Sequence, residues 1–341
     1  MSQKNVLTPG TKVEGTHYTY TIERVLGKGA YGITYLASTV VPVNGEYGMI
    51  DMNMFVTLKE FFMDGRMTRN GVAVERDAKD KDLDTFARCF YLEADKLSSL
   101  SHPNIVKVLE AFVANNTCYY SMEYISGGSL QDYILKKDGL PEQEALKYIK
   151  QLGSALNHMH EHMMLHLDVK PSNIMFSADG KLKLIDYGLS VQYETNGEPE
   201  SRDGMGCGTP GYAPLEQSNA NEQSNFDPKL DVYALGATYY KMLTGLTPSP
   251  AVEVLQSGIN ATALVSKNVS QQSIDAIKAA MQPMAKDRLN TVDEFLAMLP
   301  DHREKEGKEN VIDTPQAKNW KVILLIVAAV VVVILCIGLL L

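Results

Sequence analysis

The chain has 341 residues, of which 45% are apolar, so it is long enough for about two folding units with full cores. Its net charge of −9 argues against a protein that binds the phosphate backbone of nucleic acids. The four cysteines, at positions 89, 118, 207 and 336, have no paired spacing, which favours free thiols in a reducing compartment over a disulfide or zinc framework.

The first part of the chain is predicted to form strands. Tyr18, Tyr20 and Ile22 alternate with polar residues, a glycine-rich turn follows, and the extended pattern resumes in "TYLAS". A turn-rich insertion over 39–54 precedes a further strand, "MFVTLKEFF", and the charged stretch 64–83 is expected to be loop. The N-terminal segment 1–16 has no apolar run, so no secretory signal peptide is expected.

The glycine-rich turn, "GKGAYG", lies between two of these predicted strands. Gly27, Gly29 and Gly32 allow backbone N–H groups to close over phosphate oxygens without interference from a Cβ atom. The same spacing marks dinucleotide-binding folds, where it opens a helix. Because the strand pattern continues after this turn, we favour a loop that covers a triphosphate.

Two charged residues interrupt apolar patterns in this region. Lys59 lies within the strand "MFVTLKEFF", and Glu93 lies in the apolar stripe of a helix that is predicted from about Asp84. An ion pair between them would explain both positions and would hold Lys59 toward a phosphate. Glu75 and Asp77 are rival partners for the lysine, but they fall in the predicted loop.

The clearest predicted helix covers 141–163. Pro141 opens it, two glutamates occupy its first turn, and apolar residues then recur at steps of three and four. The segment "NIMFSADGKLKLID" reads as two strands joined by a turn at Asp179-Gly180. Helices separated by loops are expected from there on, over 230–298.

The end of this helix is rich in histidine. His158 and His162 have a spacing that could suit zinc, but the glutamate pattern of a metalloprotease helix is absent. We therefore expect His158, His160 and His162 to lie at the solvated end of the helix.

Four polar residues follow the helix at positions that suit phosphate chemistry. Asp168, Lys170 and Asn173 come just after it, and Asp186 comes after the two predicted strands. Two acids and an amide on either side of a hairpin can converge on one magnesium–nucleotide site. In that site Asp186 and Asn173 would hold the metal, and Asp168 would accept a hydroxyl proton.

The C-terminal part differs from the rest of the chain. Residues 300–321 are charged and read as a solvated linker, whose average span is about 25 Å. Residues 322–341 are apolar and uncharged, and as a helix they would be about 30 Å long, the thickness of a bilayer core. A buried core helix would need a polar face. With Trp320 and Lys321 at its boundary, the segment predicts a transmembrane helix that serves as a tail anchor.

The order of the motifs resembles one protein family. The motifs are "GKGAYGITY", "VTLK", "LEADKLSSLSHPNIV", "SMEYISGGSL", "HLDVKPSN", "DYG", "GTPGYAPLE" and "DVYALG". From about residue 18 to residue 299 the chain resembles a eukaryotic-like (Hanks-type) serine/threonine protein kinase, most closely the bacterial membrane-anchored members. The resemblance implies an α+β, two-lobed protein kinase fold over 17–299, with a β-rich N-lobe over about 17–122 and a helical C-lobe over about 126–299.

The resemblance also implies an ATP site. The residues that would bind ATP are Gly27, Lys28, Gly29, Gly32, Lys59, Met122, Glu123, Ile125 and Met175. Met122 would stand at the back of the adenine site and Met175 beneath adenine, while Glu123 and Ile125 would offer backbone groups to it. Lys59, held by Glu93, would contact the α- and β-phosphates.

The implied catalytic roles agree with the reading of the polar residues above. Asp168 would be the catalytic base and Lys170 a contact to the transferred phosphate. Asn173 and Asp186 would bind Mg²⁺, for which Mn²⁺ could substitute. Lys170, two residues after the base, is typical of the serine/threonine branch.

The family also implies structural and substrate-site roles in the C-lobe. Thr209 in "GTPGY" is typical of the serine/threonine branch and would lie at the peptide site. Glu216 would pair with Arg288, and Asp231 would brace the catalytic loop from below.

Several positions depart from the family pattern, Thr34, Thr57, Pro214 and Leu215 among them. Leu167 replaces the arginine that usually precedes the catalytic base and gathers a phosphate on the activation loop. Leucine cannot do this, so activity is expected not to depend on phosphorylation of that loop. Tyr187 replaces phenylalanine in "DYG", and Tyr233, in place of a tryptophan, is expected simply to pack.

The sequence thus predicts a membrane-tethered serine/threonine protein kinase with ATP and Mg²⁺ as cofactors, protein substrates and no nucleic-acid partner. Self-association for autophosphorylation in trans and contact with a bilayer through the C-terminal helix are expected. The kinase domain would be cytoplasmic, at the inner membrane of a bacterial cell. The alternatives are a pseudokinase that uses the fold as a binding switch and a small-molecule kinase of related fold.

Overall fold

The computed structural model describes residues 5–29, 31–45, 48–77, 79–186, 191–192, 208–218 and 227–301. The chain divides into a compact unit, Met1–Pro300, and a C-terminal unit, Asp301–Leu341. The predicted transmembrane helix over 322–341 and nearly all of the predicted linker lie outside the described residues. Within those residues, no helix combines the length and the apolar character that crossing a membrane requires.

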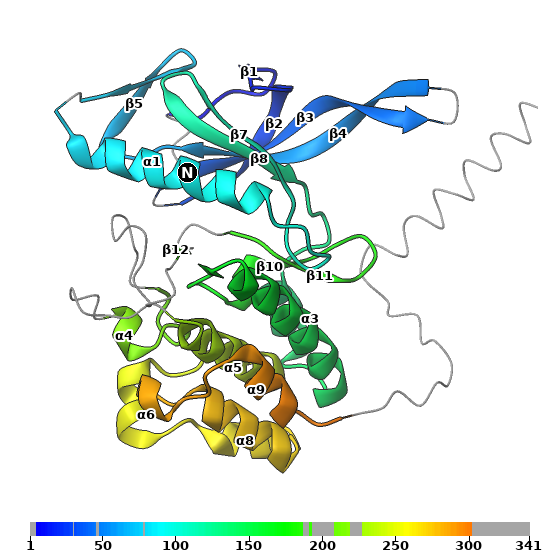
Figure 1. Cartoon of the computed structure of the whole chain (residues 1–341), viewed down its shortest axis with the longest axis vertical. Coiled ribbons are helices and arrows are strands. Elements are labelled where there is room, and N and C mark those ends of the chain that lie inside the picture. Colours follow the sequence, from blue (N-terminus) through cyan, green and yellow to red (C-terminus); the bar gives the residue numbers. More distant parts are fainter. Residues whose placement is uncertain are drawn as a thin grey trace, which may run out of the picture. The chain divides into compact units, whose positions relative to one another are not determined.

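The N-lobe is built on one antiparallel sheet with the strand order β1-β2-β3-β4-β8-β7 (Figure 1). Its strands are β1 (Lys12–Glu14), β2 (Thr19–Lys28), β3 (Gly32–Gly45), β4 (Gly48–Phe61), β7 (Val108–Ala114) and β8 (Thr117–Glu123). Helix α1 (Lys81–Ser98) packs on the sheet, where its Phe90 ring lies 5.7 Å from that of Phe61. Leu58 of β4, three residues from Phe61, lies on the other face of the sheet and is fully buried there, and Tyr20 and Ile22 of β2 are fully buried as well.

Three segments of the N-lobe differ from the prediction. The insertion 39–54 is not turn-rich: β3 and β4 pair without a break as far as Gly45 and Gly48. The stretch 64–83 is not loop, because it contains a second hairpin, β5 (Met67–Asn70) and β6 (Ala73–Arg76). Helix α1 begins earlier than expected, after the cap residue Asp80, whose side chain accepts a hydrogen bond from Leu83 N.

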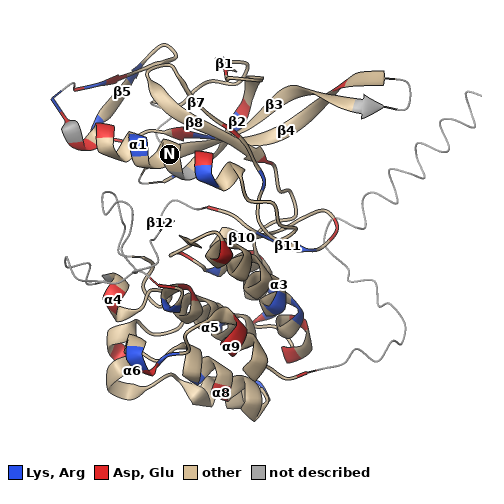
Figure 2. Cartoon of the chain, viewed as in Figure 1, with Lys and Arg blue, Asp and Glu red and all other residues tan. Residues whose placement is uncertain are grey.

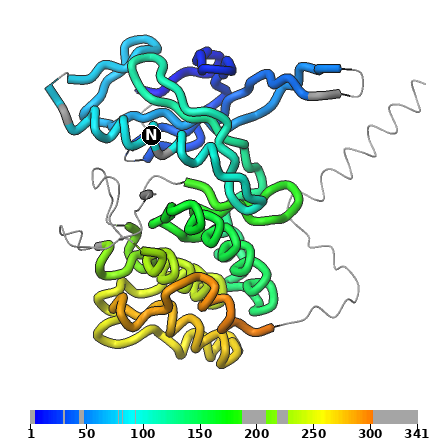
Figure 3. Tube along the Cα trace, in the orientation of Figure 1, coloured from blue at the N-terminus to red at the C-terminus, as the bar shows by residue number. Residues whose placement is uncertain are grey.

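The C-lobe is helical, as predicted (Figure 3). Its helices are α2 (Leu130–Lys137), α3 (Glu142–Glu161), α4 (Leu215–Ser218), α5 (Lys229–Thr244), α6 (Ala251–Ser257), α7 (Ala261–Ser266), α8 (Gln271–Ala280) and α9 (Val292–Met298). Every residue of α5 from Leu230 to Thr244 is buried, so this helix is the centre of the lobe. Two single 3-10 turns complete the lobe, η1 (Pro171–Asn173) and η2 (Ala285–Asp287).

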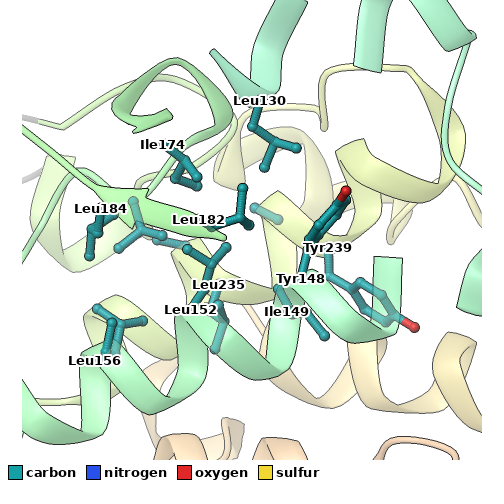
Figure 4. Close-up of a cluster of buried hydrophobic side chains, with 14 of the residues drawn as sticks. Leu130, Tyr148, Ile149, Leu152, Leu156, Ile174, Leu182, Leu184, Leu235 and Tyr239 are labelled. Carbon is teal, nitrogen blue, oxygen red and sulfur yellow. The ribbon is translucent and has the colours of Figure 1, made fainter. Parts of the chain in front are cut away.

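A hydrophobic cluster fixes the segment that carries the polar motif residues (Figure 4). Leu152 of α3 and Leu235 of α5 meet Leu182 there, and all three are fully buried. Leu182 belongs to the hairpin of β10 (Ile174–Phe176) and β11 (Leu182–Leu184), whose turn at Gly180 has φ +78°, as the sequence predicted. The preceding strand β9 (Met164–Leu165) pairs with β12 (Val191–Gln192). Because these strands pack on buried helices, the positions of the loops at their ends are fixed.

Candidate functional site

A buried aspartate organises the loop between β9 and β10. Asp231 of α5 has no exposed surface and accepts hydrogen bonds from His166 N at 2.9 Å and Leu167 N at 2.8 Å. His160 Nε2 of α3 lies 2.8 Å from the same carboxylate. Burial opposes the charge of this carboxylate, but the hydrogen bonds from His160 and His166 outweigh it and hold the pKa of Asp231 below its usual range.

The histidines at the end of α3 do not all lie in solvent. His162 is exposed, as expected, whereas His160 faces Asp231 with only 10% of its side chain exposed. His158 is half-buried, and its ring stacks at 5.4 Å on that of His102. The prediction of a solvated helix end was therefore wrong for His160 and His158, because the last turn of α3 packs against α5 and against the loop that carries His102.

Leu167, the residue that departs from the family pattern, is buried. Its exposed fraction is 4% and its backbone is left-handed, with φ +64°. Its N–H is bound by Asp231, and its carbonyl accepts a hydrogen bond of 2.7 Å from Gln217 Nε2, which is also buried. Leu167 thus contributes a buried, uncharged side chain and a fixed backbone to the loop.

Asp168 lies at the centre of a network of four polar side chains. Asn173 Nδ2 donates to the Asp168 carbonyl at 3.0 Å and to its Oδ2 at 2.9 Å. Lys170 Nζ lies 2.7 Å from the same Oδ2. Thr209 Oγ1 donates to Asp168 Oδ1 at 2.6 Å and accepts from Lys170 Nζ at 2.6 Å. The carboxylate is therefore fixed in orientation beside a cation.

Lys59 and Asp186 join the two lobes. Lys59 Nζ, on β4, donates to Asp186 Oδ1 at 2.5 Å and lies 5.6 Å from the centre of the Tyr120 ring. Attraction to Lys59 outweighs burial and lowers the pKa of Asp186. Burial opposes the charge on Lys59, yet Asp186 raises the pKa of the amine overall. The Glu93 side chain lies outside the described part of α1, so its pairing with Lys59 stays a prediction.

The predicted ATP-binding residues lie on the N-lobe sheet, in the connection between the lobes and on β10. The glycine turn is closed by a bond of 2.8 Å from Gly29 N to Gly32 O, between the end of β2 and the start of β3. A Cβ atom at Gly32 would lie 2.5 Å from the carbonyl oxygen of Glu60, so only glycine fits there. Gly27 and Lys28 end β2, and the Lys28 amine lies 3.7 Å from an Asp64 oxygen.

The residues expected around adenine come from β8, the following connection and β10. Met122, near the end of β8, is buried and lies opposite Thr57 of β4. Glu123 ends β8, and its carboxylate accepts a hydrogen bond of 2.7 Å from Lys183 Nζ. Ile125 is buried in the connection between the lobes, and Met175 lies half-buried in β10.

Asn173 and Asp186 provide the donor set that a hard cation needs. The Asn173 amide nitrogen is bound to Asp168, which leaves its amide oxygen as the group available to a metal. Within the described residues, no group of three or more histidine, cysteine, aspartate or glutamate side chains could hold a metal ion. Mg²⁺ usually takes one or two protein oxygens and completes its shell with water and phosphate, so these residues fit it.

The predicted partners Glu216 and Arg288 are joined in the C-lobe. Arg288 Nη1 donates to Glu216 Oε1 at 2.7 Å, and the guanidinium side chain has no exposed surface. The guanidinium also donates to the carbonyls of Gln282, Lys229 and Pro283. It ties the segment that carries Thr209 and Glu216 to the loop before α9.

The family comparison agrees with this geometry. The model of the protein kinase domain matches residues 65–303, most of the chain. The chain belongs to the protein kinase family. The match begins just after β4, so the glycine turn and the β3–β4 hairpin lie outside it.

Two similar curated proteins are serine/threonine kinases. The kinase is 30% identical over 301 residues to the serine/threonine-protein kinase cds1 of Schizosaccharomyces pombe, covering 85% of this chain and 58% of that protein. It is 29% identical over 239 residues to the serine/threonine-protein kinase PrkC of Bacillus subtilis, covering 70% and 32%. These relatives agree with the Hanks-type serine/threonine resemblance.

A solved structure has the same fold. The structure of Rad53 residues 1–466 in complex with AMP-PNP matches with a TM-score of 0.57 and 21% identity, over 82% of this kinase and 64% of that chain. This kinase spans less than two thirds of the length of each of these three proteins.

Sequence reasoning missed three supporting residues of the kinase. His160 binds Asp231, Gln217 binds the Leu167 carbonyl, and Lys183 binds Glu123. Of the three, only Lys183 could have been noticed in the sequence, as a charged residue between the two leucines of a predicted strand. The other two contacts join segments 71 and 50 residues apart, which no local pattern reveals.

Proposed function

We propose that the kinase transfers the γ-phosphate of ATP to serine and threonine hydroxyls of proteins. The observation that carries the proposal is the Asp168 network. A carboxylate held by Asn173 and by Thr209 has one orientation, and the Lys170 amine lies beside it. Asp168 is thus prepared to accept the proton of a substrate hydroxyl while Lys170 offsets charge on the phosphate that is transferred.

ATP and Mg²⁺ complete this proposal. Bound Mg²⁺ would offset the charge of the phosphates, and Asn173 and Asp186 would hold it. Lys59 is charged and already close to Asp186, so it can bind the α- and β-phosphates without being recruited from solvent. The AMP-PNP in the Rad53 structure shows that the fold holds such a nucleotide in that protein.

A membrane tether is the second part of the proposal. Residues 322–341 contain no charged residue and follow Trp320 and Lys321, as an anchored tail requires. The kinase domain would then be held on the cytoplasmic side of the inner membrane of a bacterial cell. Copies confined to one surface would phosphorylate each other in trans more readily than copies free in solution.

The burial of Leu167 supports activity without phosphorylation of the activation loop. An arginine at this position would need a phosphate partner, whereas the Leu167 side chain is uncharged and buried and its backbone is hydrogen-bonded on both sides. The loop that contains Asp168 is therefore ordered by Asp231 and Gln217, neither of which depends on a modification.

Replacing the catalytic base tests the phosphate transfer. The full-length chain and its Asp168→Asn variant are incubated with radiolabelled ATP, Mg²⁺ and a mixture of protein substrates. We expect the variant to lose at least about a hundredfold in rate, because it cannot accept the proton. Asp179→Asn, in the exposed turn of the β10–β11 hairpin, is the matched control and should keep full activity. Equal labelling by wild type and Asp168→Asn, or none from either, would favour the pseudokinase.

A further inference from the structure

The β3–β4 hairpin extends beyond the body of the N-lobe (Figure 1). Strand β2 pairs with β3 only as far as Ser38, and β8 pairs with β4 only from Val56 onward. From there to the tip, β3 and β4 have only each other as partners in the described part of the chain. We call this segment, residues 39–55, the projecting hairpin.

One face of the projecting hairpin continues the apolar face of the core. Side chains alternate across a strand, so residues on the side of buried Ala37 and Val56 share one face. That face carries Thr39, Val41, Val43, Ile50, Met52 and Met54, none of them charged. Ile50 and Met52 are 57% and 46% exposed. Exposed apolar side chains gathered in this way mark an interaction surface.

The two edges of the projecting hairpin are not equivalent. Proline has no N–H and is tolerated in a ladder only where its nitrogen faces away from the paired strand. Pro42 therefore interrupts the outer edge of β3. The outer edge of β4, from Gly48 to Phe55, contains no proline and has no strand partner among the described residues. This edge is the one that can add a strand.

The β4 edge is complementary to itself. In an antiparallel pairing of "MIDMNMF" with a second copy, centred on Met52, Ile50 faces Met54 and Met49 faces Phe55. The one charged residue of this stretch, Asp51, faces Asn53 and not its own copy. A shift of the centre to Asp51 would place two carboxylates opposite each other, which is unfavourable. Of these two registers, the sequence favours the one centred on Met52.

We propose that two copies of the kinase associate through the β4 edges of their projecting hairpins, antiparallel and with Met52 on the two-fold axis. The interface is isologous, so each copy contributes the same strand. The pairing does not depend on the proposed phosphate transfer or on the membrane tether. Two paired hairpins would form a four-stranded antiparallel sheet. In that sheet the N–H and C=O groups at the outer edge of β4 would be hydrogen-bonded to the second copy.

Charge favours a second copy over a lipid surface as the occupant. The projecting hairpin contains no lysine or arginine, and its only charged residues are Glu46 and Asp51. Figure 2 shows no blue along the described part of this hairpin. Anionic lipid surfaces attract segments rich in lysine and arginine, and this hairpin contains neither. Pairing through this sparsely charged, projecting segment keeps the acidic bodies of two copies apart.

Disulfide trapping tests the register. Met52→Cys, Asp51→Cys and Asn53→Cys are made in the full-length chain in detergent micelles, oxidised mildly and mapped by mass spectrometry. We expect a 52–52 linked dimer from Met52→Cys, because directly opposed residues lie within disulfide reach. Asp51→Cys alone and Asn53→Cys alone should form little disulfide-linked dimer. A mixture of the two variants should form a 51–53 linked dimer, because these residues face each other in the proposed register. Equal linking of all three variants alone, or no 52–52 peptide, would overturn the register and with it the proposal.

The oligomeric state provides an independent test. The wild-type chain should sediment as a dimer at micromolar concentration. The double variant Ile50→Lys/Met52→Lys should raise the dissociation constant at least about tenfold, because it opposes like charges across the axis. Val113→Lys, an exposed site on β7, is the matched control and should stay dimeric. A wild-type monomer refutes the proposal. So does a monomer that still binds phosphatidylcholine vesicles after 320–341 are deleted and loses that binding with Ile50→Lys/Met52→Lys, since the occupant of the hairpin would then be lipid.

Discussion

At the scale of single residues, Tyr233 is a core residue whose hydroxyl group is less well accommodated than its ring. The residue is fully buried in α5, and its ring lies 5.1 Å from the Arg288 guanidinium. Its hydroxyl is buried and has no hydrogen-bond partner in the described part of the chain. The ring therefore contributes packing, as the sequence suggested, while the hydroxyl incurs a desolvation cost.

We expect Tyr233→Phe to be neutral or to stabilise the kinase by up to about 1 kcal/mol, because it removes that unsatisfied group. Burial raises the pKa of Tyr233 to about 12, so the folded state keeps this hydroxyl protonated at a pH where the unfolded state loses the proton. The wild-type kinase therefore loses free energy of unfolding as the pH rises from 10 toward 12. The advantage of the phenylalanine variant should grow over that interval. Denaturant unfolding of both proteins at pH 8 and pH 11 measures it.

Tyr239→Phe is the matched control for this comparison. Tyr239 is equally buried in α5, but its hydroxyl lies 2.9 Å from Ser273 Oγ. Removing it should cost about 1 kcal/mol or more, since the Ser273 hydroxyl loses its partner. Destabilisation by Tyr233→Phe equal to that by Tyr239→Phe would show that the Tyr233 hydroxyl does make a favourable bond.

Leu167 yields a prediction about regulation. Ser190, Thr195 and Ser201 are hydroxyl residues of the segment after Asp186, and they lie outside the described residues. Because no arginine precedes Asp168 to receive a phosphate, converting all three to alanine should leave most of the rate of phosphate transfer. The measurement is transfer to a protein substrate under saturating ATP. A collapse of the rate in the triple variant would show that a loop phosphate is needed.

At the scale of elements, a buried ion pair joins the strands of the N-lobe. Glu60 of β4 is fully buried, and Arg69 Nη2 of β5 donates to its Oε2 at 2.5 Å. Tyr35 of β3 also donates to this carboxylate, at 2.8 Å, and Tyr119 of β8 donates to its other oxygen. The cluster fixes the residue next to Lys59.

Removing one partner of this pair should be costly. Arg69→Met leaves the Glu60 carboxylate buried without its cation, and we expect it to lower the free energy of unfolding by about 3–5 kcal/mol. The double variant Glu60→Gln/Arg69→Met removes both charges and should recover part of the loss. Thermal unfolding of the two variants beside wild type compares them. A double variant no more stable than Arg69→Met would mean that the charge is not the cause.

Prediction of elements from sequence succeeded where one face of an element is apolar and failed elsewhere. The stripe of 141–163 predicted α3, observed over Glu142–Glu161. The projecting hairpin was missed because its apolar residues lie on both faces, with glycines near the tip, so no alternation is visible. Strands β5 and β6 were missed because each has a single fully buried residue, Met67 and Val74.

The sequence predicted the polar residues of the candidate site. It did not predict the contacts that hold them in place. Asp168, Lys170 and Asn173 stand within six positions of each other and carry a recognisable motif, and the structure brings them together. Thr209 joins them only because the chain returns 41 residues later. The proximity of Lys59 to Asp186 depends on how the lobes meet, which no local pattern determines.

At the scale of the whole molecule, the tail and the projecting hairpin would act on the same equilibrium. A tether confines copies to a surface and raises their effective concentration, while a self-complementary strand gives them a defined contact. The two contributions can be separated, because one lies in 320–341 and the other in β4.

Deleting 320–341 should lower autophosphorylation in the presence of lipid vesicles at fixed total protein, because the chains are no longer confined. Phosphorylation of an added protein substrate in detergent solution should be unchanged, since Asp168 and its partners are untouched. Trp320, the single tryptophan of the chain, reports insertion directly: in the intact protein its emission should shift to the blue with vesicles. Autophosphorylation that survives the deletion, with an emission wavelength insensitive to lipid, would refute the tether. The β4 pairing would then be the remaining route to phosphorylation in trans, and Ile50→Lys/Met52→Lys should abolish what remains.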